Sequence, residues 1–335
     1  MVTVEHNVDL SGRNTFRMKV SCDTFVEYSS SQELQSLDFD SLPGPWLHIG
    51  AGSNLLFTGD FKGTVFHSAI RYVKYVDMGL EEVLLTVGAG VILDDLVKET
   101  CGYGLWGLEN LSSIPGEVGA AAVQNVGAYG VEAKDVIAGV VCFDLQERKK
   151  VIFKTPECAY GYRDSRFKQE KGRYIVTSVL FRLTRKYSPK LEYKGLSEIF
   201  AGREDLTPAE IREAVVRIRK EKLPDPSEIG SAGSFFKNPV LSGAQFARVA
   251  QGYASVPHYI LEGGFVKVPA AWMIEQCGFK GYKEGNVAVY ERQPLVLVNA
   301  SGTAAPEEVM ALEQKIISAV WEKFGVELIP EVEHI

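Results

Sequence analysis

One stretch of this sequence decides its fold: residues Ser113 to Glu132, which read S-I-P-G-E-V-G-A-A-A-V-Q-N-V-G-A-Y-G-V-E. Glycine and alanine dominate it, and Glu117 is its only acid before the last residue. Such a segment offers little side-chain surface to a core, but glycine lets its backbone come close to a ligand. Successive N–H groups can then bind phosphate without a lysine. One interpretation is a dinucleotide cofactor lying along this backbone. The other is a tightly packed glycine-rich turn, because one such loop is only weakly diagnostic.

A second glycine turn, Gly50-Ala51-Gly52-Ser53-Asn54, follows a short apolar strand expected at residues 46–49. It resembles a Rossmann fingerprint only superficially, because the third glycine is missing and residues 55–59 look like further turn rather than helix. A nicotinamide-binding Rossmann domain is therefore disfavoured. Two backbone loops from different subdomains suit a pyrophosphate held between them, while an ordinary turn remains the alternative for either loop alone.

Composition narrows the class of protein. The chain has 335 residues, enough for two or three domains, and is 46% hydrophobic and 24% charged. Its net charge is −7 without a long basic run, which argues against a nucleic-acid partner. No apolar stretch is long enough to span a bilayer, and the N-terminus does not resemble a signal peptide. Five scattered cysteines and five unclustered histidines indicate a cytoplasmic protein with reduced thiols and no metal site. We therefore expect small-molecule partners and neither nucleic acid nor membrane.

Hydrophobic periodicity predicts a first half of alternating short strands and helices, then a mainly helical second half. A helix is expected to begin at Thr207, which with Glu210 forms a capping box, after a linker at 186–202. The main domain boundary is expected near 186–206. The predicted strands are 17–28, 46–49, 83–87 and 174–183, with a hairpin of 136–144 and 150–153; the other helices are 30–37, 93–100, 244–251, 270–277 and 306–324; and 326–333 is extended.

Three further segments contain candidate catalytic side chains. Arg163, beside two tyrosines in the segment Tyr160–Ser165, could clamp a carboxylate or phosphate; the alternative is a surface arginine paired with Asp164. Ser234 lacks the second glycine and the histidine partner that a hydrolase nucleophile needs, so it is better interpreted as a proton donor, or otherwise as a cap or turn serine. Glu331 lies in a tail where acids are usually solvated.

Taken together, these motifs resemble one family, the UDP-N-acetylenolpyruvoylglucosamine reductases, also called UDP-N-acetylmuramate dehydrogenases (MurB). The resemblance runs in the family's order over nearly the whole chain, and residues 251–264 look like the tyrosine-bearing loop of its longer, type I members. The matching motifs are N-T-F (14–16), G-A-G-S-N (50–54), I-P-G (114–116), Q-N-V-G-A-Y-G (124–130), G-Y-R-D-S (161–165), K-L-P-D-P (222–226), G-S-F-F-K-N-P (233–239) and P-E-V (330–332).

The resemblance implies an α+β protein with an FAD-binding domain of the vanillyl-alcohol-oxidase (PCMH) type. The implied parts are FAD-binding subdomains at 1–75 and 76–200, an α+β substrate-binding domain at 201–325 and a C-terminal segment, 326–335, that returns to the active site. It also implies non-covalent FAD, NADPH as hydride donor and a monomer. The implied reaction reduces enolpyruvyl-UDP-N-acetylglucosamine to UDP-N-acetylmuramate for peptidoglycan synthesis.

The resemblance also assigns residues. Arg163 and Glu331 would polarise the substrate carboxylate, which requires Glu331 to be protonated, and Ser234 would deliver the proton. Residues implied in cofactor binding are Gly50, Ala51, Gly52, Ser53, Asn54, Pro115, Gly116, Gly119, Ala120, Gln124, Asn125, Gly127, Ala128 and Tyr129. Residues implied in substrate binding are Tyr162, Tyr193, Lys222, Asn238, Tyr259, Lys280 and Gln293.

Two departures and two alternatives remain. Glu333 stands where some relatives are expected to carry arginine, so Arg219 is a candidate for the missing cation. Ala120 to Ala122 replace more polar residues, so FAD oxygens would meet backbone N–H groups there. One alternative is another flavoenzyme of this fold; we expect no histidine in or near either loop, which counts against covalent attachment of flavin. The other is a non-catalytic flavin or sugar-nucleotide binder, which the joint presence of Arg163, Ser234 and Glu331 disfavours.

Overall fold

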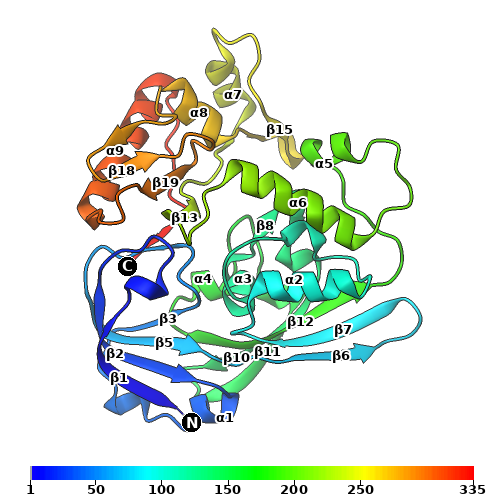
Figure 1. Cartoon of the computed structure of the whole chain (residues 1–335), viewed down its shortest axis with the longest axis vertical. Helices are drawn as coiled ribbons and strands as arrows, with labels where there is room; N and C mark the ends of the chain where they lie inside the picture. The colour runs from blue at the N-terminus through cyan, green and yellow to red at the C-terminus, as the bar shows by residue number, and fades with distance from the viewer. Residues whose placement is uncertain (1) are drawn as a thin grey trace. The chain divides into compact units, whose positions relative to one another are not determined.

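The computed structural model describes residues 2–335, which divide by their contacts into two compact units (Figure 1). The first comprises the chain up to Val8, Cys22–Ala51 and Phe61–Arg219; the second comprises Asp9–Ser21, Gly52–Asp60 and Lys220–Ile335. This division differs from the four-part organisation expected from the sequence. Two N-terminal segments join the C-terminal unit, and the main boundary lies after residue 219 rather than near 186–206.

The first unit contains a four-stranded sheet in which β5 lies between β2 and β3, parallel to both. Strand β5 is buried from Gly63 onward, as expected for a strand paired on both edges. An aromatic cluster, with Phe39 stacked 5.8 Å from Phe143 and tilted against Phe66, packs beside this sheet. The order is β1 (Thr3–Asp9), β2 (Ser21–Tyr28), β5 (Phe61–Ser68) and β3 (Trp46–Ile49), with α1 (Ser31–Gln35) after β2.

A five-stranded antiparallel sheet forms the other layer of this unit. Helices α2 and α3 cover one of its faces, and their apolar side chains join those of the strands in one core (Figure 1). The expected hairpin is present, with Cys142 opposite Val151. The order is β11 (Lys149–Lys154), β10 (Ile137–Asp144), β12 (Tyr174–Thr184), β7 (Glu82–Gly88) and β6 (Val73–Asp77), and the helices are α2 (Leu93–Gly102), α3 (Val118–Gln124) and α4 (Arg166–Gln169).

Helix α6 (Pro208–Lys222) explains where the first unit ends. Its predicted apolar stripe, which includes Ile211 and Val215, packs on Trp106 and on Leu196 of α5 (Lys194–Ile199). Its capping box is present, because Thr207 and Glu210 exchange hydrogen bonds. Burial of this stripe against the first unit outweighs the linker-like composition of the preceding segment, so most of α6 belongs to that unit.

The second unit is built on a four-stranded sheet with helices α8 and α9 (Figure 1). Two side-chain contacts anchor the N-terminal segment to it: Thr15 Oγ1 donates to the Ser231 carbonyl (2.6 Å), and Asn299 Nδ2 donates to the Phe16 carbonyl (3.2 Å). The sheet order is β13 (Gly230–Ser234), β19 (Val296–Asn299), β18 (Val287–Val289) and β17 (Lys283–Glu284), with α7 (Gly243–Ala250), α8 (Ala270–Gln276) and α9 (Pro306–Phe324).

Small strands complete the two units. In the second, β14 (Val240–Leu241), β16 (Val266–Lys267) and β15 (Tyr259–Ile260) form a sheet, and β20 (Glu333–His334) pairs in parallel with β4 (Leu55–Leu56). In the first, β8 (Gly127–Ala128) pairs with β9 (Val131–Glu132). Among residues 2–335, no helix has the length and apolar character needed to cross a membrane.

Candidate active site

The glycine-rich stretch is not a loop throughout, because α3 forms inside it. The N–H groups of Val118 and Gly119 donate to the carbonyls of Val91 and Ala89 (both 2.9 Å), and Ala121 N–H donates to Glu117. These N–H groups therefore do not form the open row of phosphate donors expected along this part of the stretch. The glycine at 119 has a packing reason, since a Cβ there would lie 2.8 Å from the Cβ of Ala89.

The two glycine loops meet at Gly50, within the first unit. A Cβ on Gly50 would lie 3.1 Å from the Cβ of Ala120 and 3.2 Å from Glu117 Oε2. The backbone of the first loop at Gly50 therefore lies against the side chains of Glu117 and Ala120 at the start of α3. Gly52, in the second unit, has φ +63°, and a Cβ there would lie 2.2 Å from the Arg13 carbonyl oxygen. Only glycine fits that close approach.

A histidine that is distant in sequence from the glycine-rich stretch lies beside it in the structure. His67 of β5 is 7% exposed and lies between two carboxylates, with Nδ1 2.7 Å from Glu27 Oε2 and Nε2 2.9 Å from Glu117 Oε1. Burial lowers the pKa of His67, but the hydrogen bonds and charges of Glu117 and Glu27 outweigh it and leave the pKa raised. The expectation that no histidine lies near the loops is therefore wrong, because the folded chain places His67 against Glu117 of the glycine-rich stretch. Both ring nitrogens are nevertheless engaged by protein.

Left-handed backbone is concentrated in this region. Ser113, Asn125, Tyr129 and Arg163 have φ of 59°, 47°, 50° and 54°, and they are four of the eight non-glycine residues with positive φ among residues 2–335. Such conformations cost energy and persist where the surroundings impose them, often at functional sites. The strain therefore supports a ligand site formed by the glycine-rich stretch and the Arg163 turn.

Ser113, the first residue of the stretch, is held at both of its backbone polar groups. Its N–H donates to Asp94 Oδ1 of α2 (2.5 Å), and its carbonyl accepts from Arg219 Nε of α6 (3.1 Å). Arg212 forms a bidentate pair with Asp94 at 2.5 and 2.9 Å. Arg219 also hydrogen-bonds Tyr129 near the other end of the stretch. Burial raises the pKa of Asp94, but Arg212 and the Ser113 N–H outweigh it and lower the pKa overall.

Arg163 points at the Q-N-V-G-A-Y-G motif rather than at its neighbour Asp164. Its Nη2 donates to the Gly127 carbonyl (2.6 Å) and its Nη1 to the Asn125 carbonyl (3.4 Å), while the guanidinium lies 5.3 Å from the Tyr162 ring. The alternative of a surface arginine paired with Asp164 is thus wrong. The structure places this candidate catalytic cation directly beside candidate cofactor-binding backbone.

Two neighbours of Arg163 have distinct roles. Asn125 is fully buried, and its amide donates to Glu132 Oε2 and the Gly161 carbonyl while its Oδ1 accepts from Lys134 N–H. Its side chain is therefore occupied by protein, and it fixes the turn that carries Arg163. Tyr129 and Tyr193 meet edge to face with ring centroids 4.9 Å apart, which joins a candidate cofactor residue to a candidate substrate residue.

In the second unit the structure brings together three motifs that are remote in sequence. Glu331 N–H donates to the carbonyl of Phe235, the residue after Ser234 (2.8 Å). Asn54 Nδ2 donates to the Glu331 carbonyl (3.1 Å), and Glu333 N–H donates back to the Asn54 carbonyl (3.0 Å). The tail is therefore not free in solution: it is a strand-like segment that lies against the serine strand and the first glycine loop.

The other candidate substrate residues of the second unit differ in what occupies them. Asn238 Oδ1 accepts from the Ala270 N–H at the start of α8 (2.9 Å), and Lys280 pairs with Glu275 at 2.7 Å. Tyr259 is 53% exposed in β15. Lys222 is exposed and Gln293 is partly buried. Asn238 thus has a structural role of its own, at the start of α8.

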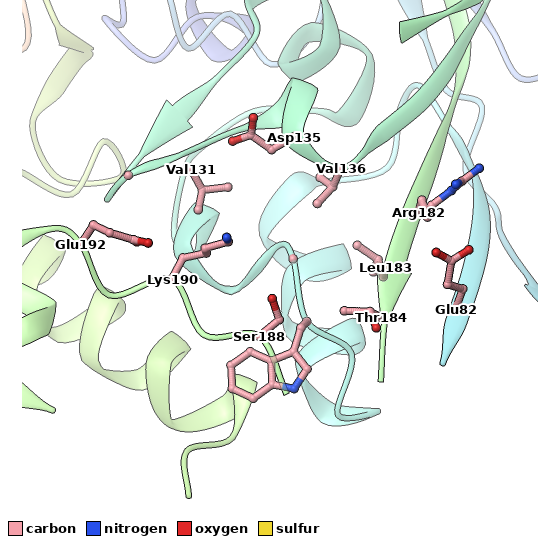
Figure 2. A pocket seen from close by; sticks show the side chains of 13 residues that line it. Glu82, Val131, Asp135, Val136, Arg182, Leu183, Thr184, Ser188, Lys190 and Glu192 are labelled. Atoms are coloured by element: carbon pink, nitrogen blue, oxygen red, sulfur yellow. The ribbon is translucent and has the colours of Figure 1, made fainter. Parts of the chain in front are cut away.

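A cavity of about 630 Å³ in the first unit contains none of the predicted site residues. Figure 2 shows Glu82 and Arg182 on one side of it and Lys190 and Glu192 on the other. Buried Trp106, Val131 and Leu183 form apolar parts of its lining. Its rim carries both charge signs, so it does not select a ligand class, and Gly130 and Val131 bring the end of the glycine-rich stretch into its lining.

A match to a known domain family defines the class of protein to which the chain belongs. A model described as "FAD binding domain" matches residues 40–146, which include the loop at Gly50 and α3. The chain is thus a flavoprotein with an FAD-binding domain of the PCMH-type oxidase fold, as expected.

The particular family follows from the second half and from whole-chain similarity. The model "UDP-N-acetylenolpyruvoylglucosamine reductase, C-terminal domain" matches residues 225–335. The chain is 43% identical over 334 residues to the UDP-N-acetylenolpyruvoylglucosamine reductase of Bacteroides fragilis strain YCH46, covering 99% of this chain and 100% of the relative. It is 42% identical to that of Porphyromonas gingivalis strain W83, covering 99% of each. The chain belongs to the UDP-N-acetylenolpyruvoylglucosamine reductase family.

A solved structure agrees with this assignment over the full length. The crystal structure of UDP-N-acetylenolpyruvylglucosamine reductase (MurB) from Thermus caldophilus matches with a TM-score of 0.71 at 25% identity, covering 100% of this chain and 99% of that one. The predictions of fold class and family are thus confirmed.

The residues in hand fit FAD. Gly50 lies against Ala120 at the start of α3, so the two loops meet through small residues, which suits a pyrophosphate lying close to backbone. Both ring nitrogens of His67 are engaged by Glu27 and Glu117, which fits a non-covalently bound flavin.

Proposed function

We propose that this chain performs its family's reaction with three residues, Arg163, Ser234 and Glu331. The protein is an NADPH-dependent flavoprotein oxidoreductase that reduces enolpyruvyl-UDP-N-acetylglucosamine to UDP-N-acetylmuramate, a step of peptidoglycan synthesis. FAD held by the two glycine loops would supply the hydride transfer from NADPH to the enolpyruvyl terminal carbon. The single observation that carries the residue assignment is the hydrogen bond of Glu331 N–H to Phe235, because it sets two motifs about 100 residues apart against each other.

Arg163 is assigned to the substrate carboxylate. When hydride adds to the terminal carbon, negative charge develops on the adjacent carbon and its carboxylate as an enolate. A guanidinium fixed in advance stabilises this charge without reorganising during the reaction. The bonds of Arg163 to the Gly127 and Asn125 carbonyls supply that fixation. Tyr162, at the face of the guanidinium, limits its movement.

Ser234 and Glu331 are assigned to the proton and to the developing charge. The Ser234 hydroxyl gives its proton to the carbon next to the carboxylate, which forms the new C–H bond and completes the reduction of the double bond. A hydroxyl is a weak acid, but it is adequate toward an enolate carbon. Glu331 is assigned to the same carboxylate, where negative charge accumulates during the reaction.

The remaining assignments rest on family membership and on the positions of the side chains. Tyr162, Tyr193, Lys222, Asn238, Tyr259, Lys280 and Gln293 would bind the UDP-sugar. The glycine loops would bind FAD. We assign the enzyme to the cytoplasm, because it draws on NADPH and a nucleotide sugar, and we propose that it works as a monomer.

One anaerobic experiment tests the proposal. The purified protein should be yellow, NADPH should bleach it, and enolpyruvyl-UDP-N-acetylglucosamine should restore the colour. A preparation that binds FAD and is bleached but does not recolour would reject the substrate. Flavin that could not be bound at all would reject the cofactor.

A further inference from the structure

The last residues of the chain form a fastened segment rather than a loose tail. Strand β20 pairs in parallel with β4, so that Ile335 N–H donates to the Leu56 carbonyl (2.9 Å) and Thr58 N–H donates to the Ile335 carbonyl (2.8 Å). Glu331 lies two residues before β20. The position of the Glu331 carboxyl group therefore depends on how firmly this short segment is held.

One side chain of the segment reaches the long helix of the same unit. His334 Nε2 lies 2.8 Å from Glu313 Oε2, and Glu313 is a buried residue of α9, only 4% exposed. The His334 ring also meets the ring of Phe235 edge-on, with centroids 6.1 Å apart. Because Phe235 follows Ser234 and accepts the Glu331 N–H, His334 contacts the supports of both assigned residues.

We propose that His334 is a positioning residue that, by binding Glu313, holds the C-terminal segment so that Glu331 stays beside Ser234. This inference rests on the proposed function of those two residues. Breaking the pair leaves a buried carboxylate without its partner, which is costly and favours displacement of the segment. His334 itself touches no reacting atom in this scheme.

The pair makes the arrangement sensitive to pH. The hydrogen bond to Glu313 raises the pKa of His334; burial opposes this, while the charge of Glu313 and the Val332 backbone add to it. The groups facing the ring are Glu313 from α9 and Phe235, and β4 contributes only leucines. A raised pKa means that the charged pair is complete at lower pH and is lost as pH rises through that pKa. The pH effect should appear in the reduction of the substrate, which is the half-reaction assigned to Glu331.

The test measures the two half-reactions of the FAD-loaded enzyme separately, by anaerobic rapid mixing across pH. In His334→Gln, bleaching by NADPH should remain near wild type, while recolouring by substrate should slow about five-fold at neutral pH, since a charge-assisted hydrogen bond is lost. The alkaline fall of the wild-type recolouring rate should disappear in this variant. His334→Arg, a permanent cation, should retain the fast rate and flatten the profile. His6→Gln, on exposed β1, is the matched control and should behave as wild type.

Several results would overturn the proposal. It fails if His334→Gln recolours at the wild-type rate with the wild-type pH profile, or if both half-reactions slow equally. If that variant does not fold, the NMR titration of His334 in wild type and in Glu313→Gln decides: an unchanged pKa rejects the pairing. Glu331→Gln separates this proposal from the assigned mechanism, because it should slow recolouring at every pH. Full activity of Glu331→Gln would reject the role of Glu331 itself.

Discussion

The glycine-rich stretch of the first unit and the C-terminal segment of the second are both held in place, but by different forces. The stretch is strained at Ser113 and Tyr129 and is fixed by charged side chains from α2 and α6. The C-terminal segment is held mainly by backbone hydrogen bonds to β4 and to residues 235–237, which follow β13. The difference indicates that the proposed cofactor-binding stretch is fixed by long-range side-chain contacts, and the segment that carries Glu331 by backbone pairing.

The largest effect should come from a substitution of Ser234, whose neighbour Phe235 is hydrogen-bonded to the C-terminal segment. In Ser234→Ala, recolouring of the flavin by substrate should fall about 100- to 10,000-fold, because a positioned proton donor contributes that much. Bleaching by NADPH should persist, since no proton from Ser234 is needed there. Ser301→Ala, at an exposed turn, is the control. Wild-type rates in both half-reactions of Ser234→Ala would remove the serine from the mechanism.

The next largest effect should come from the side chains that hold the stretch. Asp94→Asn removes the charge that pairs with Arg212 and weakens the acceptor of the Ser113 N–H, so FAD affinity should fall about ten-fold, measured by flavin fluorescence titration. Arg203→Gln disrupts an equally short but exposed pair with Asp205 and should change FAD affinity by less than about two-fold. Equal losses in the two variants would show that the stretch is insensitive to its anchors.

Close packing beneath the stretch gives a third prediction. Gly119→Ala places a Cβ 2.8 Å from that of Ala89 and should lower the free energy of unfolding by about 1–3 kcal/mol, measured by denaturant titration. Gly59→Ala is the matched control, because nothing lies within 4 Å of its added Cβ. If Gly119→Ala were as stable as Gly59→Ala, α3 would not need its close approach to the strand.

The smallest effect should be a pH dependence from His67. Its folded-state pKa is raised, so its stabilising pairing with Glu27 and Glu117 is fully present below the unfolded pKa of about 6.5 and is lost as pH rises through the folded value. The difference in unfolding free energy between wild type and His67→Gln should therefore be largest in mild acid and shrink with rising pH. A difference that grows toward alkaline pH would contradict the charged state of His67.

Local signals in the sequence were sufficient for much of the fold. The capping box at Thr207 and the 3.6-residue stripe of α9 predicted those helices closely. Helix α3 escaped prediction, because its glycines and alanines carry no periodic pattern and its first N–H groups pair with residues 89 and 91, about 30 positions away. The contacts of His67 with Glu117 and of Asp94 with Ser113 were missed for the same reason: only the folded chain brings these residues together.

The candidate site divides in the same way. Arg163, Ser234 and Glu331 were identified as candidates through short motifs, because residue type and order can be read directly from the sequence. The role of Asn125 was not, since its three side-chain hydrogen bonds to Glu132, Gly161 and Lys134 depend on a buried turn. Sequence could identify the residues suited to the chemistry but not those that orient them.

The second unit draws on three separate pieces of the chain, and this has a consequence for the order of events during synthesis. Residues 61–219 of the first unit leave the ribosome as one continuous run, which contains the whole five-stranded sheet with α2 and α3 and follows β1, β2 and β3. The second unit needs Thr15 and Gly52 from the beginning of the chain and Glu331 from its end. Its N-terminal pieces therefore gain their partners in the second unit only after residues 220–335 have been synthesised. A fragment starting at Lys220 would lack them, and expressing that half alone should give an unstable product.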